Sequence, residues 1–90
     1  MRADSLSDEI NIMEKVRQFV VTHFYVPDPA TVVGETSLLR EGIVDSAGVL
    51  ELVSFLEETF SIRITDEELL PENLDSLRQI GTFVRRKKGL

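Results

Sequence analysis

The sequence predicts an all-α fold, a small bundle of three to four helices with a long loop between the first helix and the second. Several segments space their apolar residues at helical intervals, so each would present an apolar stripe to a shared core. Two prolines and two glycines separate the first two of these segments and favour a loop there. The 90 residues predict one domain over 1–90, and the sequence contains no cysteine for a disulfide or a thiolate metal site.

The first helix is predicted over residues 7–24. Ser7 is the expected N-cap, because a serine hydroxyl accepts a hydrogen bond from the free N–H groups of the first turn. Pro27 lies soon after the segment and prevents the helix from continuing far. The apolar residues that share one side of this helix are Ile12, Met13, Val16, Phe19, Val20 and Phe24.

Residues 25–44 form the predicted loop. Loops of this length are uncommon in compact domains, and they often have a functional role. Apolar side chains along the segment are expected to hold it against the core, and they are Val32, Val33, Leu38, Leu39, Ile43 and Val44.

The second helix is predicted over residues 46–60, with Asp45 as its N-cap. Its apolar positions recur at helical spacing and should be buried: Val49, Leu52, Val53, Leu56 and Phe60. The opposite face is small or polar and should be exposed; its residues are Ala47, Glu51, Ser54 and Glu58.

The C-terminal third predicts two further helices. After a short extended connection, residues 66–70 are expected to form one helical turn that ends at Pro71. The last helix is predicted over residues 75–87, with Leu77, Ile80 and Val84 facing the core. The basic residues at 85–88 suit the negative end of that helix.

Charge and hydropathy exclude several classes of function. The net charge is −6, with 16 acidic and 10 basic residues, so the chain would repel nucleic acid and anionic membranes and attract basic protein surfaces. No apolar run approaches the roughly 18 residues of a membrane span. The polar start of the chain is unlike a signal or transit peptide, so a cytoplasmic location is expected. No metal site is expected, because the acidic cluster at 66–68 lacks the spacing of a calcium loop.

Residues 38–46 read Leu-Leu-Arg-Glu-Gly-Ile-Val-Asp-Ser. They are followed by Glu-Leu-Val at 51–53, Leu-Glu-Glu-Thr-Phe at 56–60 and Ile-Arg-Ile-Thr-Asp-Glu-Glu at 62–68. This pattern resembles the acyl carrier protein family over roughly residues 8–84. The resemblance implies an acyl-carrier-type helical bundle in which Ser46, after the motif residue Asp45, receives 4′-phosphopantetheine from coenzyme A.

The dipeptide Asp-Ser occurs three times, ending at Ser5, Ser46 and Ser76, so it does not identify the site alone. Ser5 precedes the predicted first helix and Ser76 begins the last, where serine is a common capping residue. Only Ser46 follows the long loop and begins a helix with the complete pattern. In the first turn its hydroxyl would face solvent, and an attached phosphodiester would lie near the positive helix end.

The resemblance further implies a free-standing, monomeric carrier that is not an enzyme. It would hold acyl intermediates as thioesters for fatty-acid, polyketide or related lipid synthesis. A phosphopantetheinyl transferase would modify it, and activating ligases and synthases with basic surfaces would dock on the exposed face of the second helix, at Ala47, Glu51, Ser54 and Glu58. Two alternatives remain open: an aminoacyl or peptidyl carrier on the same scaffold, and an unmodified acidic interaction domain.

Two positions depart from the family pattern, because Ala47 replaces a bulky apolar residue and Gly48 replaces a common acidic one. Glycine lowers helix stability by roughly 0.5–1 kcal/mol relative to alanine, so a looser first turn is expected. The only histidine, His23, is expected to be a packed or capping residue at the end of the first helix. A catalytic triad with Ser46 and Asp45 is not expected, because adjacent residues cannot flank one imidazole in triad order.

Overall fold

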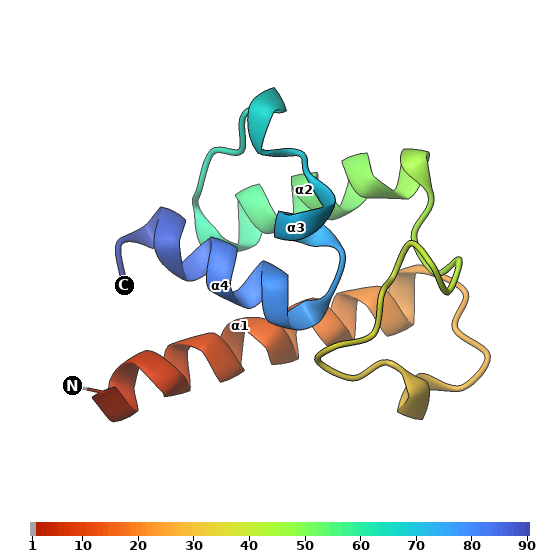
Figure 1. Cartoon of the computed structure of the whole chain (residues 1–90), viewed down its shortest axis with the longest axis horizontal. Coiled ribbons are helices and arrows are strands. Elements are labelled where there is room, and N and C mark those ends of the chain that lie inside the picture. The colour runs from red at the N-terminus through yellow and green to blue at the C-terminus, as the bar shows by residue number, and fades with distance from the viewer. Residues whose placement is uncertain (1) are drawn as a thin grey trace.

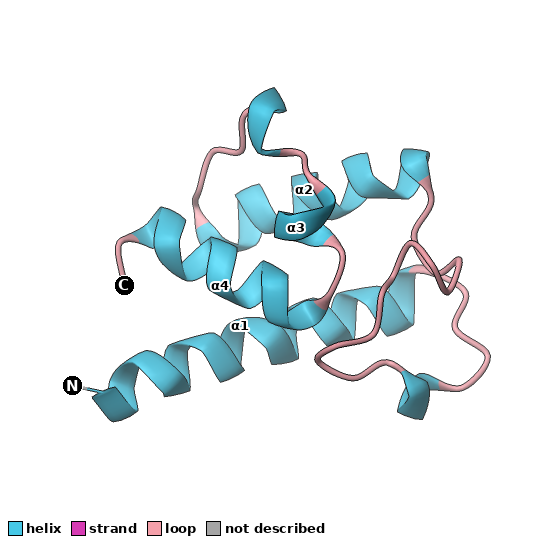
Figure 2. Cartoon of the chain, viewed as in Figure 1, coloured by secondary structure: helices cyan, strands magenta, loops and turns pink. Residues whose placement is uncertain are grey.

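The computed structural model describes residues 2–90, and the side chains from Ser7 onward, and it contains helices and connecting loops (Figures 1 and 2). The predicted all-α class is confirmed, with no strand in the described part of the chain. The helices are α1 (Arg2–His23), α2 (Ser46–Phe60), α3 (Pro71–Leu74) and α4 (Leu77–Lys88), with 3₁₀ turns η1 (Pro29–Thr31) and η2 (Asp66–Glu68). Over residues 2–90, none of these helices is both long enough and apolar enough to cross a bilayer.

Helix α4 occupies the middle of the bundle and packs against α1, α3 and α2, most extensively against α1 (Figure 1). Helices α1, α2 and α4 contribute residues of their predicted apolar stripes to one core, α3 adds Leu74, and the long loop adds three more buried side chains. The predicted stripe residues that are only partly buried are Met13, Phe19, Phe24, Val49 and Val53. The core residues are Ile12, Val16, Val20, Val32, Leu38, Val44, Leu52, Leu56, Phe60, Ile64, Leu74, Leu77, Ile80, Phe83 and Val84.

Helix α1 begins at Arg2, so the prediction that Ser7 caps it is wrong, and Ser5 lies within the helix instead of before it. The preference of serine for the N-cap is only about 1 kcal/mol. Neither proline nor glycine occurs before Ser7, so the helix continues past it toward the N-terminus. The other end is one residue short of the prediction, although the Phe24 N–H still donates to the Val20 carbonyl at 3.0 Å.

The long loop is held by polar contacts as well as by apolar ones. Arg17 of α1 donates from Nε to the Val32 carbonyl at 3.0 Å and from Nη2 to the Pro29 carbonyl at 2.6 Å. Val32, Leu38 and Val44 are buried and Ile43 is half-buried, as predicted. Val33 and Leu39 are not, with exposures of 56% and 43%. Each follows a buried residue directly, and this irregular segment does not direct two consecutive side chains to the core.

The predicted helical turn in 66–70 forms as the 3₁₀ turn η2, which ends at Glu68. The prediction that Pro71 ends it is wrong, because Pro71 begins α3. Proline suits the first helical position, where no N–H is required. The last helix begins at Leu77 instead of residue 75. Asp75 lies before it and holds the long loop, accepting from the Leu39 N–H at 2.9 Å and the Ser37 hydroxyl at 2.6 Å.

The basic residues at the end of α4 make specific contacts with other elements. Arg85 pairs with Glu9 of α1 at 3.0 Å, and Lys87 pairs with Glu68 of η2 at 2.9 Å. Lys88 donates to the Phe60 carbonyl at the end of α2 at 3.1 Å. These side chains therefore tie α4 to its neighbours in addition to complementing the helix end.

Candidate functional site

Ser46 is the first residue of α2 and is exposed to solvent. Asp45 precedes it in an extended conformation, and its Oδ1 accepts a hydrogen bond from the Gly48 N–H at 2.8 Å. The prediction that Asp45 caps this helix is confirmed. Because the cap fixes the backbone on the N-terminal side of Ser46, the hydroxyl is presented in the first helical turn, where another protein can reach it.

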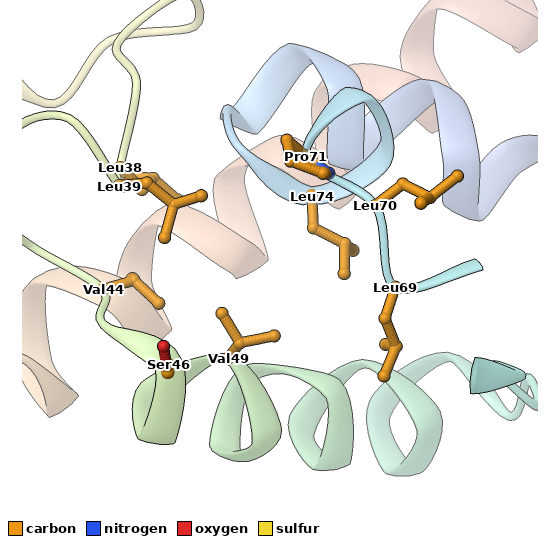
Figure 3. Close-up of a pocket in the computed structure, with 9 residues that line it drawn as sticks. All are labelled: Leu38, Leu39, Val44, Ser46, Val49, Leu69, Leu70, Pro71 and Leu74. Carbon is orange, nitrogen blue, oxygen red and sulfur yellow. The ribbon is translucent and has the colours of Figure 1, made fainter. Parts of the chain in front are cut away.

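An apolar pocket of about 180 Å³ opens beside Ser46, between α2, the end of the long loop and the segment around α3 (Figure 3). Figure 3 shows Val49 of α2 and Leu74 of α3 extending toward one another, with the Ser46 oxygen on the side of α2 that faces the pocket. Of the nine lining residues, Ser46 alone has a polar side chain; the others are Leu38, Leu39, Val44, Val49, Leu69, Leu70, Pro71 and Leu74. The hydroxyl therefore lies at the edge of an otherwise apolar space.

The other side of the first turn is closed by Phe24, the residue that follows α1. A Cβ atom added at Gly48 would lie 2.8 Å from Cε1 of Phe24, closer than side chains approach one another in proteins. Gly48 is buried, and the looser first turn expected at this position stays a prediction. Glycine allows the Phe24 ring to lie directly against the backbone of α2, which explains the departure from the family pattern through packing.

No family model matches the sequence. The acyl carrier protein of Thermosynechococcus vestitus is 35% identical over 80 residues, which cover 89% of this chain and 95% of that protein. The acyl carrier protein of Campylobacter concisus is 35% identical over 75 residues, covering 83% and 94%. That of Solidesulfovibrio magneticus is 28% identical over 80 residues, covering 89% and 99%.

This chain belongs to the acyl carrier protein family. Acyl carrier proteins are carriers and not enzymes, so the chain is not expected to lower a reaction barrier itself. The family generally bears a phosphopantetheine group and interacts with synthase and transferase enzymes. The residues present fit such a group. Ser46, the first residue of α2, has an exposed hydroxyl, and the pocket beside it can accept apolar atoms.

The other two Asp-Ser pairs of this acyl carrier protein offer no comparable site. Ser76 is 5% exposed and caps α4, where its Oγ accepts from the Gln79 N–H at 3.2 Å. Ser5 lies within α1, and its side chain is outside the described ones. Of the two Asp-Ser serines whose side chains are described, only Ser46 is both exposed and at the start of a long helix.

The outward face of α2 contains Ala47, Glu51, Ser54 and Glu58, and all four are exposed as predicted. Sequence reasoning missed Leu50, which is 62% exposed on the same face. The helical spacing that relates it to Ala47 and Ser54 was the available signal. Glu57 faces inward and accepts from the Ile64 N–H at 2.8 Å, so it supports the turn after α2.

His23 packs by stacking on Phe19, with ring centroids 4.7 Å apart. Its Nε2 lies 2.5 Å from Oε1 of Glu51, on the outward face of α2. The imidazole is therefore bonded to Glu51, while the Asp45 carboxylate is bonded to the Gly48 N–H. A Ser–His–Asp triad does not form.

Proposed function

We propose that this protein carries acyl intermediates as thioesters on a 4′-phosphopantetheine arm attached to Ser46, for fatty-acid, polyketide or related lipid synthesis. The observation that supports the proposal is the exposed hydroxyl at the capped start of α2, at the edge of an apolar pocket. Family membership supports the carrier role, and the geometry of Ser46 supports the position of the arm. The whole chain acts as a single carrier domain.

Attachment is a phosphoryl-transfer reaction that a separate transferase performs. The Ser46 Oγ forms a bond to the phosphorus that carries the pantetheine group, the pyrophosphate bond of coenzyme A breaks, and 3′,5′-ADP leaves. The transferase supplies the base that takes the hydroxyl proton. This chain contributes a reachable hydroxyl and the positive end of α2, which stabilises a nearby phosphodiester by about 0.3–1 kcal/mol.

The lining of the pocket favours an acyl cargo over an aminoacyl one. Eight of the nine lining side chains are apolar, so a hydrocarbon chain loses water contact there without leaving polar groups unpaired. A charged amino group would be desolvated in the same space with only the Ser46 oxygen as a lining polar side-chain atom. The pocket would therefore shelter part of an acyl group while the thioester is in transit.

The partners we propose are the transferase and the acyl-activating ligases and synthases that have basic docking surfaces. Glu51 and Glu58 are exposed on α2, and the chain as a whole has a net charge of −6. Electrostatic docking gives fast, salt-sensitive association and modest affinity, which suits a monomeric carrier that must leave each enzyme in turn.

The test is intact mass spectrometry after incubation of the unmodified protein with coenzyme A and a broad-specificity phosphopantetheinyl transferase. Wild type and Ser5→Ala should gain one phosphopantetheine mass, and Ser46→Ala should gain none. No adduct on the wild type would leave the unmodified interaction domain as the better hypothesis. An adduct on Ser46→Ala would place the attachment site elsewhere.

A thermal denaturation of the same variants separates a functional serine from a structural one. Because Ser46 is exposed and the cap is formed by Asp45, Ser46→Ala should change the free energy of unfolding by less than about 0.5 kcal/mol. A large decrease in the melting temperature would show that Ser46 supports the fold.

A further inference from the structure

The end of α1 reaches the proposed docking face of α2 through His23. Its Nε2 lies 2.5 Å from Oε1 of Glu51, although the two residues are 28 positions apart in the sequence. The imidazole is stacked on Phe19 with rings inclined by 15°, and it meets the edge of Phe24 at 5.0 Å. Phe19 is itself stacked on Phe55 of α2 at 4.2 Å. Aromatic packing thus holds the imidazole in place against Glu51.

This contact alters the charge of the docking face. Glu51 and Glu58 are the exposed acidic residues of α2, and together they contribute two negative charges when His23 is neutral. A protonated imidazole adds one positive charge, so the summed charge of the three side chains changes from −2 to −1. Histidine is the side chain that ordinarily changes charge between pH 5 and 8. Among the side chains that the structure describes, from Ser7 onward, Glu51 is the charged one that contacts the imidazole; its aromatic neighbours are Phe19 and Phe24.

We propose that His23 competes with the arginine or lysine of a docking partner for Glu51, so that partners bind more weakly when His23 is protonated. The proposal rests on the proposed function, because the partners are the transferase and the enzymes that load or use the carrier. Glu51 lies five residues after Ser46, about 7.5 Å further along the helix axis. A protein that reaches the Ser46 hydroxyl therefore covers this part of α2.

The competition follows from the chemistry of the two states. A neutral imidazole donates one N–H to Glu51 and leaves the carboxylate charge available to an incoming cation. An imidazolium forms a charge-assisted bond with the same carboxylate and repels that cation. Both side chains are about half exposed, at 45% and 56%. The difference should therefore be that of a surface ion pair, about two- to fivefold in partner affinity.

The experiment compares three proteins that differ only in the residue at position 23. His23→Gln keeps a hydrogen-bond donor that never becomes charged, and His23→Lys places a permanent positive charge there. The kcat/KM for modification of Ser46 by the transferase is measured from pH 5.5 to 8 at low ionic strength. Ratios between proteins at each pH remove the transferase's own pH dependence.

We expect the ratio of wild type to His23→Gln to fall about two- to fivefold as the pH decreases from 8 to 5.5. The ratio of wild type to His23→Lys should fall as well, from above one toward one. In a Glu51→Gln background the wild-type ratio should fall less, because the imidazolium then repels the partner's cation but no longer occupies its carboxylate. A wild-type ratio that is flat over this range, or one that falls as steeply in the Glu51→Gln background, overturns the proposal.

A second measurement separates failure of this inference from failure of the proposed function. If the wild type forms no phosphopantetheine adduct, the proposed function fails, and the competition is then tested with a hexa-arginine peptide. Backbone amide shifts around Glu51 report peptide binding without any modification of Ser46. The same pH-dependent loss of affinity in wild type, absent in His23→Gln, supports the competition. Equal pH dependence in both proteins overturns it.

Discussion

The contact between α1 and α4 and the contact between α2 and α3 differ in how closely they are packed. Between α4 and α1, a Cβ atom added at Gly81 would lie 2.9 Å from Cγ of Met13, so the two helices approach closely. A partly buried ion pair between Arg85 and Glu9 lies along the same contact. Between α2 and α3 the side chains leave a pocket of about 180 Å³.

The difference shows how a small carrier can be stable and still keep a space open. The α1–α4 contact is filled, so its side chains contribute both transfer free energy and dispersion contacts. The walls of the pocket contribute less, because Leu39 and Leu70 remain 43% and 41% exposed. We therefore expect the α1–α4 contact to contribute more to stability than the exposed rim formed by Leu39 and Leu70. Other residues of the pocket wall, namely Leu38, Val44 and Leu74, are buried and belong to the core.

The largest expected effect comes from a matched pair of valine deletions. Val84 of α4 is fully buried, whereas Val49 of α2 is half-buried at the pocket wall. Val84→Ala should lower the free energy of unfolding by about 2–3 kcal/mol, from lost burial plus a new cavity. Val49→Ala should lower it by about 1 kcal/mol or less, because the pocket is already open. Urea denaturation of both variants measures the difference.

The comparison of the two contacts would fail if the two deletions were equally destabilising. Both substitutions remove the same two methyl groups and both occur within helices, so the change in helix propensity is matched. An equal loss would show that the pocket wall is packed as tightly as the α1–α4 contact.

An intermediate effect is expected at Gly48, where Phe24, just after α1, lies against the first turn of α2. Gly48→Ala would bring a methyl group to 2.8 Å from Phe24 Cε1. The Phe24 ring is held against Phe19 and His23, so relief requires several side chains to shift. We expect a net loss of about 1 kcal/mol in the free energy of unfolding, since overpacking exceeds the gain in helix propensity.

A double-mutant cycle with Phe24→Leu identifies the cause of that loss. If the clash with the ring is responsible, Gly48→Ala should be better tolerated in the Phe24→Leu background, with a coupling energy of at least about 0.5 kcal/mol. Additive effects would instead assign the loss to the backbone of the first turn.

The sequence was sufficient for the helices whose apolar residues recur at regular spacing. The bounds of α2 agree with the prediction, because Asp45 provides a strong cap and the apolar pattern continues to Phe60. The beginning of α1 was missed, since Ser7 is a good capping residue but the residues before it are compatible with a helix. Local capping preferences are small, and neighbouring turns decide between them.

Parts of the candidate site depended on contacts between residues far apart in the sequence. Asp45, Ser46 and the exposed face of α2 follow from local pattern, so they were predictable. The contact of Phe24 with Gly48 and the bond between His23 and Glu51 are set by the packing of α1 on α2. Glycine at position 48, within a helix, was the only local sign of the contact with Phe24. Nothing in the local sequence indicated the bond between His23 and Glu51.

The smallest expected effect concerns the part of the pocket wall formed by Leu69 and Leu70. Polar contacts of the preceding residue hold this part in place. Glu68 accepts from the Thr65 N–H at 3.0 Å and from Lys87 of α4 at 2.9 Å, and it precedes Leu69 and Leu70 of the wall. The hydrogen bond from the Thr65 backbone, and then that from Lys87, lower the pKa of Glu68 below its ordinary value of 4.5. Because the folded-state pKa is the lower one, the stabilisation is complete above about pH 4.5 and is lost as the pH falls through the folded-state pKa.

Glu68→Gln keeps the shape of the side chain but cannot lose a proton, so it should remove this part of the acid dependence. The melting temperatures of wild type and variant should differ at pH 7 and converge as the pH falls toward 3. Glu67→Gln is the matched control, because Glu67 is the exposed neighbour on the same 3₁₀ turn and should leave the difference between pH 7 and pH 3 nearly unchanged. A constant gap between wild type and Glu68→Gln at all pH values would mean that the wall is held by packing, as the α1–α4 contact is, and not by this carboxylate.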